Sequence, residues 1–247
     1  MHTIVLATQK GGSGKSTLAI GLALAASEAG HTVRLIDADP QGTLASWQRR
    51  RTGNEPIVET VSSYTQVEQR LQAFVQSGVT LTIVDTAGGL AALTSAAIRG
   101  ADLCLIPVRP SHADIEAAAP TLSNIRSYDK PFAFVLNQTP SRGSRIGNAS
   151  SALGDEATSA IGDVIASPFI ALRNDHQDAL GHGQAVTEYA STGKSAEEIR
   201  GLWRWIDGKL ATIALADEQR ILADEADALP VEPTIYWRAP VALSAAE

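Results

Sequence analysis

Five short, continuous apolar runs alternate with helix-like segments along most of this chain. The runs are TIVLAT (3–8), VRLID (33–37), LTIVD (81–85), LCLIPV (103–108) and FAFVLN (132–137). Continuous apolar strands are typical of parallel sheets that are buried on both faces. Helical patterns fill intervals at 16–30, about 64–77, 113–127 and about 146–160. We therefore expect an α/β fold, a doubly wound and mostly parallel sheet with helices on both faces and with ligands at one strand edge.

The composition limits what such a chain can be. With 247 residues, 44% of them hydrophobic, it can form one domain with a sizeable core. The one cysteine, Cys104, lies in an apolar run and is expected to be a small core residue, which excludes a disulfide framework. We expect the main domain to span 1–210. An acidic C-terminal helix or extended tail should follow over 211–247, where seven acidic residues and two arginines supply −5 of the net charge of −7.

The segment TQKGGSGKST, residues 8–17, resembles a phosphate-binding loop but departs from the pattern G-x-x-x-x-G-K-[ST]. Gln9 stands where the first glycine is expected, and an additional lysine, Lys10, follows it. The glycines let backbone N–H groups turn toward phosphate oxygens at the N-terminus of the next helix. In this pattern Lys15 contacts the β- and γ-phosphates and Ser16 ligates Mg²⁺. Thr17 adds a hydroxyl near the α-phosphate.

Acidic residues end two of the predicted strands. LIDADPQG places Asp37 and Asp39 after one strand, and LTIVDTAGG places Asp85 at the end of another. An acid beside a phosphate loop can hold Mg²⁺ through water or orient an attacking water. Each acid taken alone could instead cap a helix or a turn.

Together, the segments KGGSGKST, DADPQG, DTAG and VLNQ resemble the ParA/MinD superfamily of P-loop ATPases with a deviant Walker A motif. The resemblance covers about residues 3–210 and is greatest to the short ParA branch. It implies a homodimer that forms with ATP and Mg²⁺. In such a dimer Lys10 would reach the partner's ATP and stabilise transition-state charge, as an arginine finger does.

The resemblance also assigns individual roles. Asp39 would position the hydrolytic water, Asp37 would support the metal shell, and Asn137 would hydrogen-bond adenine. Segments 39–44 and 86–90 would be switches that sense the γ-phosphate. At the second switch, Ala-Gly-Gly replaces the Pro-Pro of many relatives, which predicts greater flexibility. The full predicted site comprises catalytic Lys10, Lys15 and Asp39; nucleotide-binding Gly11, Gly12, Ser13, Gly14, Lys15, Ser16, Thr17 and Asn137; and metal-binding Ser16, Asp37 and Asp85.

A ParA-type positioning ATPase is the function that this resemblance favours. Its ATP dimer binds DNA without sequence preference, and an activator on the cargo, ParB-like or another adaptor, stimulates slow hydrolysis and release. The segment 193–210 would be a helix with an apolar face at Ile199, Leu202, Trp203, Ile206 and Leu210. Candidate DNA contacts are Arg173, Lys194, Arg200, Arg204 and Lys209; a solvated helix face is the alternative. The basic run WQRRRTG (47–53) is interpreted as a solvated helix end in preference to a second DNA contact.

Two other classes remain as alternatives. A MinD-like membrane switch needs a basic amphipathic C-terminal helix, whereas this tail is acidic and interrupted by prolines. A metabolic or metal-cluster ATPase, such as the nitrogenase iron protein or dethiobiotin synthetase, is disfavoured because Cys104 lies inside a strand and DADPQG does not resemble the synthetase. With no apolar run of membrane-spanning length and no signal peptide, we expect a cytoplasmic protein, nucleoid-associated in its ATP state.

Overall fold

The computed structural model describes residues 1–89, 91–157 and 161–227. The chain divides into two compact units, residues 1–213 and 214–247. The first unit contains the whole sheet, and the described residues of the second, 214–227, are helical. The predicted tail beyond residue 227 and the end of the predicted 146–160 helix lie outside the described residues.

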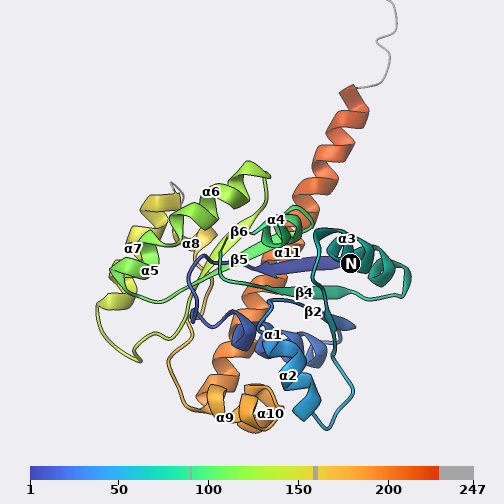
Figure 1. The fold of residues 1–247 in the computed structure, drawn as a ribbon. Coiled ribbons are helices and arrows are strands. Elements are labelled where there is room, and N and C mark those ends of the chain that lie inside the picture. The colour runs from blue at the N-terminus through green and yellow to red at the C-terminus, as the bar shows by residue number, and fades with distance from the viewer. Residues whose placement is uncertain (90, 158–160, 228–247) are drawn as a thin grey trace, which may run out of the picture. The chain divides into compact units, whose positions relative to one another are not determined.

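Six parallel strands form one sheet in the order β3-β2-β4-β1-β5-β6, which confirms the predicted α/β fold (Figure 1). Five of them are the predicted runs; the sixth, β3, is a short edge strand that the apolar pattern does not reveal. The strands are β1 (His2–Leu6), β2 (Val33–Ala38), β3 (Ile57–Thr60), β4 (Leu81–Thr86), β5 (Leu103–Val108) and β6 (Phe132–Leu136).

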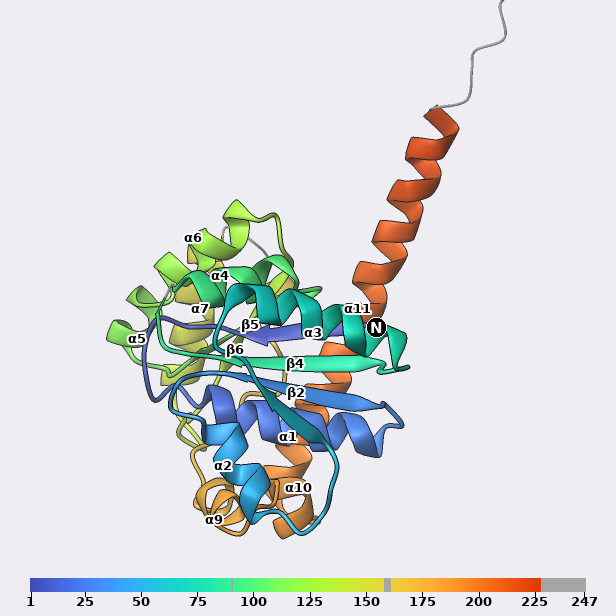
Figure 2. The same cartoon turned by 45° about the vertical axis from the view of Figure 1, so that its right-hand side comes forward.

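Each central strand contributes to two cores, one on each face of the sheet. In β1, for example, Ile4 and Leu6 face one core while Val5 faces the other. Helices α1, α2 and α11 cover the first face, and α3, α4, α6 and α7 cover the second (Figure 2). Successive strand side chains point to opposite faces, so burial on both faces requires the continuous apolar runs seen in the sequence.

The helices follow the predicted intervals, with additions. The segment 113–127 is two helices instead of one. Helix α2 ends in the run 47–53, where a helix end was expected, whereas α4, α8, α9 and α10 were not predicted. None of the helices in the described ranges is both long and apolar enough to cross a bilayer. The helices are α1 (Lys15–Glu28), α2 (Thr43–Arg50), α3 (Tyr64–Gln76), α4 (Ala92–Arg99), α5 (His112–Glu116), α6 (Ala119–Ser127), α7 (Arg145–Ala157), α8 (Ile161–Val164), α9 (Asp175–Gly181), α10 (Val186–Tyr189) and α11 (Lys194–Asp227).

The predicted apolar face of the last helix is confirmed. Its five apolar residues are at most 3% exposed, and they belong to the core on the α1 side of the sheet. The helix continues through residue 227, well past the predicted end at 210.

The strand order brings the segments with candidate functional residues to one edge of the sheet. β1 lies between β4 and β5, and β2 lies beside β4. Because the strands are parallel, the loops that follow β1, β2, β4, β5 and β6 all leave from the same edge. Ligands of open α/β sheets bind at this edge, next to the strand where the order reverses.

Candidate functional site

The loop between β1 and α1 surrounds an open cavity of about 640 Å³. Gly12 and Gly14 have φ angles of 75° and 90°, a region where residues with a Cβ are strained. A Cβ on Gly14 would also collide with the side-chain amide of Asn137. The residues of the loop and of α1 that line the cavity are Gln9, Gly11, Gly12, Gly14, Lys15, Ser16 and Thr17. The backbone at these glycines can therefore approach a bound anion at the start of α1.

Side chains from other elements hold this loop from behind. The Asn137 amide Nδ2 donates to the Ser13 carbonyl at 2.7 Å, and Gln138 Nε2 donates to the Gly12 carbonyl at 3.0 Å. The Gln9 N–H donates to the Thr121 hydroxyl on α6 at 3.1 Å. These contacts fix the loop before any ligand binds. They also give Asn137 a structural task, and its predicted contact with adenine stays a prediction.

Lys15 lines the cavity, and Asp85 lies close enough behind it for their charges to interact. Both are buried, at 7% and 0% exposed. Neither Asp85 oxygen has a hydrogen-bond partner in the parts of the chain that the structure describes. Burial raises the pKa of Asp85 to about 7, against the lowering effects of the nearby Ser16 hydroxyl and the Lys15 ammonium. Burial also lowers the pKa of Lys15, while Asp85 and Asp39 oppose that shift.

These residues fit Mg²⁺ bound together with a nucleotide. Asp85 is a buried carboxylate without hydrogen-bond partners among the described residues, and it lies beside the Ser16 hydroxyl at a helix N-terminus. The two side chains would supply only part of the oxygen ligands of a bound ion. Across residues 1–89, 91–157 and 161–227, no group of three or more His, Cys, Asp or Glu side chains could hold a metal by itself. Mg²⁺ sites of this kind use one or two protein oxygens, water and substrate phosphates. The ion would neutralise phosphate charge there, with Ser16 and Asp85 on its protein side.

The two acids that follow β2 differ in what they contact. Asp37 is fully buried and accepts hydrogen bonds from the Asp39 N–H at 3.3 Å and the Ala45 N–H at 2.9 Å. It thus satisfies amides in the first turn of α2, and its support of a metal shell stays a prediction. Asp39 lines the cavity and accepts from the Gln41 N–H at 2.9 Å. Its carboxylate therefore borders the cavity, and its role in positioning the attacking water stays a prediction.

Lys10 points away from the cavity that its own loop forms. It is not among the residues that line the cavity, and its Nζ lies 3.2 Å from Asp114 Oδ1. Arg109 Nη2 donates to the same oxygen at 2.9 Å, and the Ser111 hydroxyl donates to Oδ2. Burial raises the pKa of Asp114, but these three donors hold it below the usual range. The predictions missed this cluster, although Ser-x-x-Asp after a strand is a recognisable N-cap pattern.

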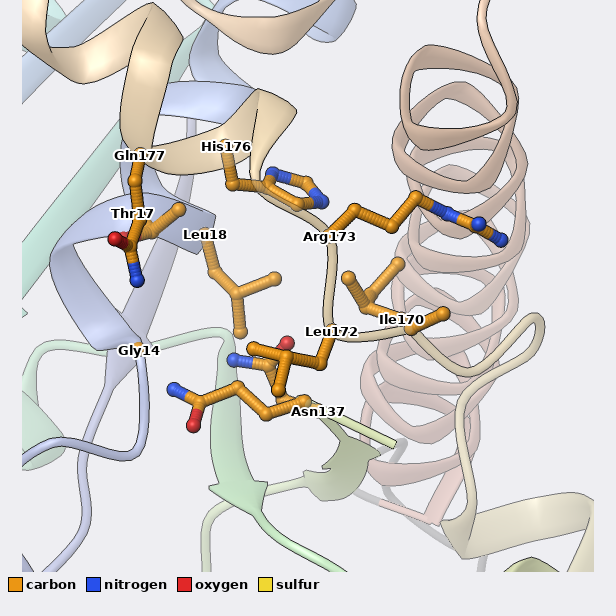
Figure 3. Close-up of a pocket in the computed structure, with 11 residues that line it drawn as sticks. Gly14, Thr17, Leu18, Asn137, Ile170, Leu172, Arg173, His176 and Gln177 are labelled. Carbon is orange, nitrogen blue, oxygen red and sulfur yellow. The ribbon is translucent and has the colours of Figure 1, made fainter. Parts of the chain in front are cut away.

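A smaller cavity of about 100 Å³ continues from the loop and shares Gly14 and Thr17 with the larger one. Figure 3 shows Leu18, Asn137 and Leu172 around it, with residues 170–173 forming one wall. Its lining is mainly apolar, with polar side chains at the margin. A nucleobase, which is flat and carries its polar groups at the edge, would suit a space lined in this way. The wall segment was not predicted, because it has no motif and lies far from the loop in sequence.

The second predicted switch lies against the start of the loop. The Gly89 N–H donates to the Thr8 carbonyl at 3.4 Å, and a Cβ on Gly88 would lie 3.3 Å from the Gln9 carbonyl. The glycines that replace Pro-Pro therefore allow close backbone approach between the two segments. The predicted increase in flexibility stays a prediction, and residue 90 lies outside the described residues.

The candidate DNA contacts differ in whether their charge is free. Lys194 and Arg204 are exposed on α11. Arg173 donates to Glu198 at 2.6 Å. Arg200 donates to Glu28 at 2.6 and 3.0 Å, and also to two backbone carbonyls. Lys209 donates to the Asp163 carbonyl at 3.0 Å. Lys194 and Arg204 are therefore the candidates without an acidic or carbonyl partner among the described residues.

The basic run 47–53 is a helix end, as expected: α2 ends at Arg50, and Arg49, Arg50, Thr52 and Gly53 are exposed. Trp47 and Arg51 are the exceptions. The Arg51 side chain is 8% exposed, lies over the Trp47 ring at 5.0 Å, and pairs with Glu188 at 2.7 Å. Trp47 is fully buried and donates its Nε1–H to the Gln184 carbonyl at 3.1 Å. A Cβ on Gly183 would collide with the backbone of residues 50 and 51. Helix α2 is therefore tied to the α9–α10 segment at its far end.

The Gly-rich cradle at the start of a buried helix, its lysine and the nearby strand acid define a P-loop nucleoside triphosphate-binding protein. Comparison with known families is more specific. The model of the CobQ/CobB/MinD/ParA nucleotide binding domain matches residues 4–211, so the chain belongs to that family. It is accordingly a ParA/MinD-family ATPase.

Individual relatives agree with this assignment. The chain is 29% identical over 206 residues to the maintenance of carboxysome distribution protein A of Halothiobacillus neapolitanus, covering 79% of this chain and 91% of the relative. It is 35% identical to protein ParA of Rhizobium radiobacter, over 51% of this chain and 56% of that protein.

Solved structures of relatives share the fold. MinD of Aquifex aeolicus superposes with a TM-score of 0.68 at 18% identity, covering 84% of this chain and 98% of MinD. A Cyanothece McdA variant in complex with ATP gives 0.65 at 19% identity, covering 82% and 96%. Pyrococcus horikoshii MinD, solved with Mg-ADP, gives 0.67 at 16% identity, covering 86% and 98%. Members of the family thus bind ATP and Mg-ADP.

Proposed function

We propose that this ATPase is a positioning switch. Its ATP-bound homodimer binds DNA without sequence preference, and an activator protein carried by the cargo stimulates hydrolysis and release. The cargo is a plasmid, a chromosome region or a protein assembly, in keeping with relatives named for chromosome partitioning and for carboxysome distribution. The protein would work in the cytoplasm, on the nucleoid in its ATP state, with the ATPase domain at 1–210 and the acidic segment 211–247 as a separate element.

The two lysines of one loop carry the dimer part of the proposal. Lys15 is buried in the floor of the cavity, where it can contact the phosphates of its own nucleotide. Lys10 does not line that cavity and is 37% exposed beside Asp114. Once it leaves Asp114, a lysine at this position would reach a nucleotide bound by another copy, where its charge would stabilise a phosphoryl-transfer transition state.

The DNA part of the proposal depends on α11. Lys194 and Arg204 are exposed there, so a dimer would offer four such cations. Each phosphate neutralised releases condensed counterion, so binding through four cations predicts a slope of log K against log salt of about −3.6. The described acids Asp217 and Glu218 lie on the helical part of the second unit, and they would repel DNA and an anionic membrane surface alike.

DNA binding by the Asp39→Ala protein tests this function. Removing the water-positioning acid should hold the ATP dimer, which size-exclusion chromatography would show. Binding to unrelated DNA sequences is then compared with ATP and with ADP across a salt series. The double variant Lys194→Ala/Arg204→Ala should lose most of the salt slope. Arg49→Ala, an exposed arginine of the basic run, serves as the matched control.

The outcomes separate the candidates. Binding that needs ATP, ignores sequence and falls steeply with salt supports the positioning cycle. An ATP dimer that binds no DNA at any salt concentration would refute the DNA step, and the dimer would then bind a protein or membrane surface. A protein that stays monomeric with ATP would refute the sandwich dimer itself.

A further inference from the structure

The segment from Pro168 to Asp175 lies along helix α11 and forms the outer wall of the smaller cavity. Residues 170–173 line the cavity on one side. On the other side the segment contacts α11 at three points. Figure 3 shows the wall between the cavity and the long helix, with the Arg173 side chain directed away from the cavity toward that helix.

The three contacts use positions of α11 that are three residues apart. The Ser195 hydroxyl donates to Asp175 Oδ2 at 2.7 Å. About one turn further along α11, Glu198 accepts hydrogen bonds from the wall segment. Gly201 permits close approach of Pro168, because a Cβ there would lie 2.9 Å from Pro168 Cδ. Positions spaced by three are neighbours on a helix surface, so these residues form one stripe that grips the whole wall.

Glu198 is the centre of this stripe, and both of its oxygens are used. Oε2 accepts the Ala171 N–H at 3.1 Å, and Oε1 accepts from Arg173 Nη2 at 2.6 Å. The Glu198 side chain is 18% exposed. By accepting its hydrogen bond, Glu198 raises the pKa of Arg173 above its ordinary value. Hydrogen bonds to an ionised partner are the stronger kind, so this carboxylate holds the wall on its α11 side, while backbone bonds to Leu136 and Thr139 hold it on the side of β6.

Glu198 makes none of the contacts that brace the phosphate loop, although the wall is bonded to Leu136 and Thr139 on either side of two of the braces. The braces of the loop come from Asn137, Gln138 and Thr121. Helix α11 itself is docked on α1 by other contacts: Ile199 lies against Gly21, and Arg200 pairs with Glu28. Changing Glu198 should therefore leave both the loop and the docking of α11 in place.

We propose that Glu198 is a positioning residue for the nucleobase: it holds residues 170–173 in the shape that the base requires. The inference rests on the proposed function, because it takes the smaller cavity as the site of the base. It predicts that recognition of the base depends on α11, whereas binding of the phosphates does not.

The test compares Glu198→Gln with Glu197→Gln, its exposed neighbour on the same helix. In Gln, one of the two accepting oxygens becomes an NH₂ donor that faces a donor of the wall. Dissociation constants for ATP and for inorganic tripolyphosphate are measured with Mg²⁺ by calorimetry on the full chain. Glu198→Gln should weaken ATP binding about tenfold and leave tripolyphosphate binding unchanged. Glu197→Gln should change neither.

A second variant perturbs the same wall without touching the carboxylate. Gly201→Ala favours the helix but pushes Pro168 outward, so it should also weaken ATP binding and spare tripolyphosphate. General loss of folding would weaken both ligands, which distinguishes a positioning role from a merely structural one.

Three results would overturn the proposal. ATP binding by Glu198→Gln that equals wild type would overturn the role of Glu198 alone. An equal loss for ATP and tripolyphosphate would do the same, because Glu198 would then act on the phosphate loop or the fold. Wild-type protein that binds tripolyphosphate as tightly as ATP would overturn the base site in the smaller cavity, and the role of Glu198 with it.

Discussion

The Lys10–Asp114 pair makes the proposed dimer open to a quantitative test through Asp114→Asn. In a single chain Lys10 is held 3.2 Å from the Asp114 carboxylate. If Lys10 contacts the partner's nucleotide, this pair must break in both protomers. Arg109 lies 2.9 Å from the same oxygen, so the carboxylate keeps a cation after Lys10 leaves. When Lys10 leaves, only the energy of the Lys10–Asp114 pair is lost, and no buried charge is left unpaired.

The size of the effect follows from exposure. The Lys10 side chain is 37% exposed, and ion pairs at such sites are worth about 1 kcal/mol or less. Two pairs per dimer give about 2 kcal/mol, which corresponds to about 30-fold in the dimerisation constant. Asp114→Asn keeps the shape of the side chain and removes its charge. It should tighten the ATP-dependent dimer by up to this factor, while ATP binding by the monomer stays unchanged.

The assay is dimer fraction against protein concentration at saturating ATP, in the Asp39→Ala background to prevent turnover. Glu116→Gln is the matched control, because Glu116 lies on the same short helix and its side chain is 68% exposed. Adding Lys10→Ala to Asp114→Asn should abolish the gain. A gain that persists without Lys10, or a dimer weakened by Asp114→Asn, would refute the competition between Asp114 and the partner's nucleotide.

Other substitutions test the remaining parts of the site. Lys15→Ala should abolish ATP binding, whereas Lys10→Ala should bind ATP normally and lose dimer-linked turnover; surviving turnover would contradict the cross-dimer role. Burial raises the pKa of Asp85 from 3.8 to about 7. The ionised carboxylate therefore destabilises the metal-free fold, and this destabilisation is absent below about pH 4 and complete above pH 7. Asp85→Asn should therefore raise the melting temperature in EDTA more at pH 8 than at pH 6, and equal rises would contradict this. Arg51→Ala should lower the free energy of unfolding by about 3 kcal/mol. This is the low end of the range for a buried ion pair, because Glu188 is 29% exposed. A loss below about 1 kcal/mol in urea unfolding would show that the pair is weak.

Much of the fold could be predicted because both-sided burial leaves a direct mark on the sequence. The five central strands need continuous apolar runs, and all five were found. Strand β3 escaped because two of its four residues are exposed and none is fully buried, so it carries no such run. The segment 113–127 has one helical pattern, yet the structure begins a new helix at Ala119, with Pro120 in its first turn.

The parts of the site whose residues lie close together in the sequence could be predicted, and the parts whose residues lie far apart could not. The loop, its lysines and the strand acids follow from spacing within a few residues. The partner of Lys10 is more than 100 residues away, and a sequence shows charges without showing which charges meet. The same limit explains Arg51, whose acidic partner lies 137 residues further along the chain. It also explains the wall at 170–173, which is positioned by α11 and by the end of β6 and carries no motif.

The anchoring of α2 limits how the first switch can respond to nucleotide. Trp47 and Arg51 hold the far end of α2 against the α9–α10 segment, and Asp37 holds its first turn. The part free to rearrange is then the short stretch 39–42, without displacement of a helix. Rearrangements of such loops take nanoseconds to microseconds, whereas collective shifts of helices take microseconds to milliseconds. The first switch should therefore relax far faster than ATP is hydrolysed, and the lifetime of the ATP state would be set by the chemical step and its activator.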